Sequence, residues 1–78
     1  MTSGPYELLH RERKAAKLAD VLHAAGIDAD TMEQCRPSTA IWATAARHAG
    51  VKLPSLKTCA AVCEMLRSRE RAVAEVRT

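Results

Sequence analysis

The chain has 78 residues, of which 47% are apolar and 3% aromatic, and its formal net charge is +3. This length allows one domain with a small core, and abundant alanine without alternating β-branched runs predicts an all-α fold, a small four-helix bundle. No apolar run approaches the roughly 20 residues that cross a bilayer, no signal peptide is visible, and an odd number of cysteines favours reduced thiols in the cytoplasm.

The first predicted helix covers Pro5–Ala25 and follows residues 1–4, which we expect to be disordered. Proline suits the first helical position, and Gly26 stands where a left-handed residue ends a helix. One face of this helix should be buried and carries Leu8, Ala15, Leu18, Ala19 and Leu22. Another face is basic, and it is either simply solvated or a site for an anionic partner; it carries His10, Arg13, Lys14 and Lys17.

A short second helix is predicted next. Asp30 can cap it, and Glu33 follows at the spacing of a capping box. The helix should end before Arg36, because a residue that precedes proline avoids the α region. Acidic side chains near a helix N-terminus are favourable for the helix dipole, so this acidic cluster does not require a metal.

The third predicted helix begins after Ser38, a good N-cap, and closes at Gly50. Its apolar face consists of Ile41, Trp42, Ala45, Ala46 and Ala49. Trp42 is the largest side chain and should occupy the centre of the core, where its indole N–H needs one partner. The alternative is that Trp42 stacks on a ligand.

The fourth predicted helix starts near Ser55 and buries a stripe that consists of Leu56, Cys59, Val62, Cys63 and Leu66. Glu70 falls in line with this stripe and interrupts it. We therefore expect residues 70–78 to project from the core or to fray. Val73 and Val76 in this segment are candidates for self-association as a homodimer.

Residues 42–62 have the spacing of a helix-turn-helix: Ala46 where two helices cross closely, Gly50 four residues later, and Val51 as an apolar plug. This quarter of the chain resembles the helix-turn-helix superfamily of DNA-binding proteins. The resemblance implies contacts from Arg47, Lys52 and Lys57 to phosphates, and from Ser55 and Thr58 to base edges. The same corner also closes an ordinary pair of packed helices that never meets DNA.

Charge and chemistry favour a binding protein over an enzyme. Residues 38–58 contain three Lys or Arg and no acid. The residues near Cys59 and His48 include no orienting third group, so we expect no enzyme, cofactor or metal. Zinc held by the cysteines and His48 is an alternative, but cysteines spaced along one apolar helical face more simply pack as small hydrophobes.

Two functional hypotheses follow. The first is a small cytoplasmic DNA-associated accessory or regulatory protein, of the size that phages and plasmids use, which binds duplex DNA mainly by phosphate contacts. The second is a helical adaptor or inhibitor that binds a protein partner and no DNA. Its surface would be the apolar strip of Met65, Val73 and Val76, or the basic side of the first helix.

Overall fold

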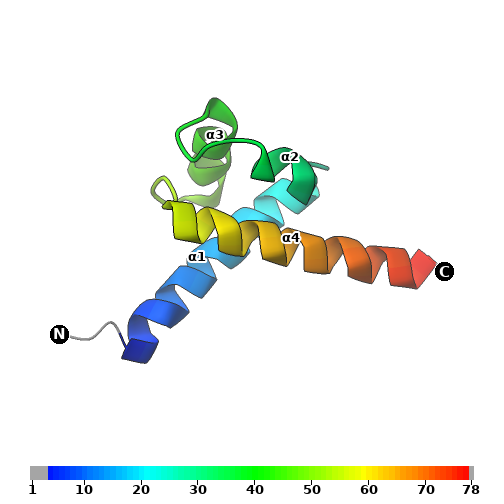
Figure 1. Ribbon diagram of the computed structural model, residues 1–78, viewed down its shortest axis with the longest axis horizontal. Coiled ribbons are helices and arrows are strands. Elements are labelled where there is room, and N and C mark those ends of the chain that lie inside the picture. The colour runs from blue at the N-terminus through cyan, green and yellow to red at the C-terminus, as the bar shows by residue number, and fades with distance from the viewer. Residues whose placement is uncertain (1–3, 78) are drawn as a thin grey trace.

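The computed structural model describes residues 4–77, which form four helices (Figure 1). In chain order they are α1 (Gly4–Ala24), α2 (Ala29–Glu33), α3 (Ala40–Ala49) and α4 (Leu56–Arg77). No strand occurs among these residues, and the predicted all-α four-helix fold is confirmed.

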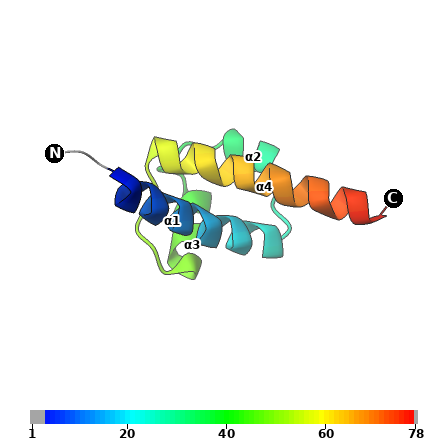
Figure 2. The same ribbon diagram turned by 90° about the horizontal axis from the view of Figure 1, so that it is seen from below.

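The two long helices, α1 and α4, cross and pack against each other, and each short helix packs on one of them (Figures 1 and 2). α3 lies against α1, and α2 lies against α4. The first half of α1 extends from the crossing at one end, and the second half of α4 extends at the other. The molecule is therefore elongated, with extents of 47 × 27 × 20 Å.

The ends of α1 follow the prediction closely. The helix ends at Ala24, and Gly26 takes a left-handed conformation with φ of 75°. The Ile27 N–H then donates to the Leu22 carbonyl at 3.0 Å, which satisfies a carbonyl at the helix end. At the other end α1 begins at Gly4, which was expected to be disordered but is helical. The rest of the segment expected to be disordered, residues 1–3, lies outside the described residues.

Helix α2 begins two residues earlier than predicted. Asp28, and not Asp30, is its N-cap, because the Asp28 Oδ1 accepts from the Thr31 N–H at 2.9 Å. Hydrogen bonding from Thr31 holds the pKa of the Asp28 carboxyl below its usual value. The helix ends at Glu33, ahead of Arg36 as expected.

Helix α3 has Thr39 as its N-cap residue in place of the predicted Ser38. The Thr39 hydroxyl donates back to the Arg36 carbonyl at 2.7 Å, so it does not cap the helix amides. At the other end Gly50 has φ of 71°, and the N–H groups of Gly50 and Val51 donate to carbonyls of the last helical turn. The predicted end of the helix at Gly50 is confirmed. The close crossing of α3 with α4 that was expected at Ala46 is not observed, because α3 packs on α1.

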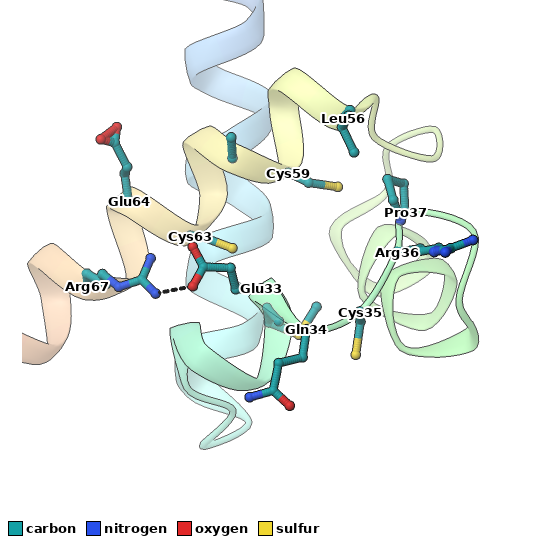
Figure 3. Close-up of a pocket in the computed structure, with 12 residues that line it drawn as sticks. Glu33, Gln34, Cys35, Arg36, Pro37, Leu56, Cys59, Cys63, Glu64 and Arg67 are labelled. Carbon is teal, nitrogen blue, oxygen red and sulfur yellow. Dashed lines mark hydrogen bonds and ion pairs between the residues drawn. The ribbon is translucent and has the colours of Figure 1, made fainter.

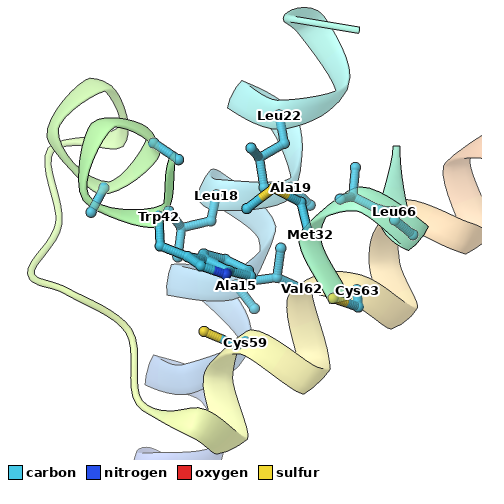
Figure 4. Close-up of a cluster of buried hydrophobic side chains, with 13 residues drawn as sticks. Ala15, Leu18, Ala19, Leu22, Met32, Trp42, Cys59, Val62, Cys63 and Leu66 are labelled. Carbon is cyan, nitrogen blue, oxygen red and sulfur yellow. The ribbon is translucent and has the colours of Figure 1, made fainter. Parts of the chain in front are cut away.

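One core lies between the four helices, with Trp42 at its centre and Ala29 and Met32 contributed by α2 (Figure 4). The Trp42 side chain is fully buried, and its Nε1 donates to the Cys35 carbonyl at 3.0 Å, the single partner that was predicted. The predicted apolar faces supply most of the other core residues: Ala15, Leu18, Ala19, Leu22, Ala45, Ala46, Cys59, Val62, Cys63 and Leu66. The Leu8 side chain lies outside the described part.

Helix α4 differs from the prediction at both ends of its buried stripe. Leu56 was expected inside but is 73% exposed, because its side chain lines the open groove near Pro37 (Figure 3). Glu70 does not mark the start of a free end, since its Oε2 accepts from the Ala29 N–H at 2.8 Å. Beyond it, residues 71–77 remain helical and exposed, and Thr78 lies outside the described residues.

Candidate nucleic-acid interface

The linker between α3 and α4, residues 50–55, is held against the rest of the protein at Pro54 and Ser55. Pro54 is buried although it lies in a loop. Ser55 caps α4, because its Oγ accepts from the Thr58 N–H at 3.2 Å. The linker is therefore a fixed part of the surface and not a free tether.

Lys14 joins the basic stripe of α1 to this linker. Its Nζ donates to the carbonyl oxygen of Leu53 at 3.3 Å, across 39 positions of sequence. His10 and Lys17 lie one turn to either side of Lys14, so the three share one side of α1. The stripe and the linker thus meet through this bond. We use the name basic pole for the stripe together with the Lys and Arg residues of positions 47–57: His10, Arg13, Lys14, Lys17, Arg47, Lys52 and Lys57.

The fold separates charge along its length. Residues 1–17 and 47–57 carry seven Lys and Arg against two acids, whereas the rest of the chain carries five against seven. In Figures 1 and 2 the first half of α1, the linker and the start of α4 gather at one end, and α2 and the second half of α4 lie toward the other. One end is therefore strongly positive and the other weakly negative.

The ion pairs recorded for residues 4–77 involve two arginines of the negative end, Arg67 and Arg69. The Arg67 guanidinium lies 3.1 Å from Asp30 and 2.6 Å from Glu33, and hydrogen bonds to Glu33 and then Asp30 raise the pKa of Arg67. Arg69 lies 2.8 Å from Asp20. Within residues 4–77, by contrast, no member of the basic pole forms an ion pair. These cations remain available to an external anion.

Four of the five residues predicted for the DNA contact are exposed: Arg47, Lys52, Ser55 and Lys57. The prediction was wrong for Thr58, which is only 5% exposed and faces inward. Its hydroxyl lies 3.1 Å from the Ser55 Oγ and is satisfied there, so burial leaves no polar atom unpaired. Thr58 is not placed to touch a base.

The other predicted sites are divided between the two ends. His10, Arg13 and Lys17 are exposed on α1, while Lys14 is half-buried against the linker. Val73 and Val76 lie on the far end of α4 and are 38% and 86% exposed. The proposed self-association segment therefore lies away from the basic pole.

All three cysteines line one open groove of about 410 Å³ beside α4 (Figure 3). Burial, with a smaller contribution from Cys63, raises the pKa of Cys59 to about 11. Burial and the Glu33 charge also raise the pKa of Cys63. Within the described part of the chain, no group of three or more His, Cys, Asp or Glu side chains is arranged to hold a metal ion. Protonated thiols of this kind are poor nucleophiles and poor ligands.

A second groove of about 480 Å³ lies between α1 and α3 and is mostly apolar, with Val21, Ile27 and Ile41 among its lining residues. His48 is its one titratable side chain. Neither groove brings together a nucleophile, a base and an orienting group.

Three tertiary interactions escaped the sequence analysis. They are the bond from Lys14 to Leu53, the cap from Glu70 to Ala29, and the Arg67 bridge to α2. Only Glu70 left a signal, because a carboxylate in line with a buried stripe requires a partner.

The chain was compared with known protein families, curated proteins and solved structures, and no match was found in any of them. Among residues 4–77, no helix combines the length and the apolar character that crossing a membrane requires.

Proposed function

We propose that the protein is a DNA-associated accessory protein of the cytoplasm that binds duplex phosphates through the basic pole. The observation that carries the proposal is the hydrogen bond from Lys14 to the Leu53 carbonyl, which joins the basic stripe of α1 to the linker that contains Lys52. Free cysteines fit a reducing compartment.

Phosphate binding would draw its affinity from counterion release. Each neutralised phosphate contributes a slope of about −0.9 to the dependence of log K on log salt. The uneven distribution of charge would also orient the protein as it approaches DNA, because the phosphates attract its positive end. A single copy with a handful of contacts would bind weakly at physiological salt.

The start of α4 supports phosphate contact better than base reading. Its exposed positions are Leu56 and Lys57, and Thr58 is buried. Bases in the major groove are read chiefly by Arg, Lys, Asn and Gln, and of these the first turn of α4 carries Lys57 alone. The proposed binding is accordingly independent of sequence.

Fluorescence anisotropy of a labelled duplex, followed across a salt series, tests the proposal. The test variant replaces Lys17, Lys52 and Lys57 with glutamine and leaves Lys14 in its tertiary bond. Its salt slope should be smaller by about 2–3, and its affinity at low salt should fall by about 10–100-fold.

A matched control removes the same charge from positions outside the basic pole. It replaces Arg36, Arg71 and Arg77 with glutamine, all exposed and without an ion pair in residues 4–77. Both variants have the same net charge, so the proposal expects only the first to lose affinity. Equal losses, or no change in anisotropy at low salt, would reject it.

The second candidate function is a helical module that binds a protein partner. The apolar groove beside α4, with Leu56 and Pro37 in its lining, favours it. A homodimer through Val73 and Val76 belongs to the same class. Sedimentation of the wild type and of Val73→Ser with Val76→Ser tests that dimer, and a monomeric mass for both would remove it.

A further inference from the structure

We infer that Leu53 acts as an apolar wedge that enters the base stack and bends the duplex. The inference rests on the proposed function and gives it a specific partner: duplex DNA that can be unstacked at one step. Its basis is the placement of Leu53 within the basic pole.

Leu53 exposes 56% of its surface in the linker that joins two parts of the basic pole. Lys52 precedes it, Lys14 binds its carbonyl, and Lys57 follows on the first turn of α4. An exposed leucine is unremarkable by itself. One that follows Lys52 directly and whose carbonyl binds Lys14 lies where phosphate contacts would press it against DNA.

The linker holds Leu53 in place. Lys14 donates to its carbonyl at 3.3 Å, and the next residue, Pro54, is buried. A wedge must be rigid, because a mobile side chain would lose the energy of insertion to ordering. The start of α4 immediately afterwards, capped by Ser55, completes this support.

Leucine is chemically suited to this insertion. Minor-groove proteins place Leu, Met, Phe or Pro between base pairs, unstack one step and kink the duplex. Stacking of a base on an aromatic ring is not the mechanism here, because Trp42 is fully buried and is the one aromatic side chain that the structure describes.

The experiment uses a duplex of about 30 base pairs with a donor and an acceptor dye at its ends, with and without a central mismatch. Wild-type protein should raise energy transfer on binding and should prefer the mismatched duplex by about tenfold, because the mismatch lowers the cost of unstacking. Leu53→Ala should lose both effects while its salt slope stays that of the wild type.

Leu56→Ala is the matched control. Leu56 is more exposed and lies three residues away, but it lines the groove beside Pro37. The inference requires this variant to bend DNA like the wild type. Binding without bending or mismatch preference, or an equal loss in both variants, overturns the wedge and leaves phosphate binding intact. Absence of any binding overturns both proposals.

Discussion

Replacing Glu70 with alanine should destabilise the protein, although Glu70 lies four turns into α4 and far from the core centre. Its Oε2 accepts from the N–H of Ala29, a residue only 1% exposed, at 2.8 Å. Without Glu70 this first amide of α2 is left buried and unpaired. The loss of such a cap costs about 1–2 kcal/mol.

The assay is urea unfolding followed by the fluorescence of Trp42, the one tryptophan of the chain. With an m-value of about 1 kcal/mol/M for a domain of this size, the midpoint should fall by about 1–2 M. Glu70→Gln keeps an acceptor oxygen but loses the charge, so it should lose about half as much. Hydrogen exchange of the Ala29 amide should accelerate in both variants.

Glu64→Ala provides the control for this prediction. Glu64 lies on the same helix and is exposed, and its side chain has no hydrogen bond or ion pair within residues 4–77. Its replacement should change stability by less than about 0.5 kcal/mol. If Glu70→Ala were no less stable than Glu64→Ala, the capping role of Glu70 would be refuted.

Two further predictions concern Gly50 and Cys59. Gly50→Ala should cost about 1–2 kcal/mol in thermal unfolding, all of it from the left-handed backbone, because an added Cβ meets nothing within 4 Å. Gly50→Asn should cost less, and an unchanged melting temperature in Gly50→Ala would contradict that backbone conformation. Because the pKa of Cys59 is raised to about 11, iodoacetamide at about pH 8 should alkylate it about 100-fold more slowly in the folded than in the unfolded chain. The raised pKa favours the folded state while the thiol is neutral, so this contribution is lost as the pH rises from 9.0 toward 11, and equal alkylation rates would disprove it.

The parts of the fold that could be predicted depend on local rules. Gly26 and Gly50 end helices because they tolerate positive φ, and Trp42 is central because no other side chain is as large. Helical spacing also placed Val62 and Leu66 inside. These features need no knowledge of which helix packs on which.

The parts that could not be predicted depend on where the helices cross. Leu56 has the right spacing for burial, but its side chain lines the open groove near Pro37. Thr58 is polar, yet a hydroxyl partner one turn away at Ser55 makes its burial inexpensive. The same limit applies to the candidate site, because the Lys14 contact with Leu53 spans 39 positions and no local pattern encodes it.

The contacts of Arg67 and Glu70 with α2 have a consequence for synthesis of the chain. Arg67 and Glu70 hold α2 from positions 34 to 41 residues later. A five-residue helix is unstable alone, and ribosomes add about 5–20 residues per second, so this segment waits roughly 2–8 s for its support. A nascent polypeptide that stalls before Arg67 would display this segment unfolded to chaperones and proteases.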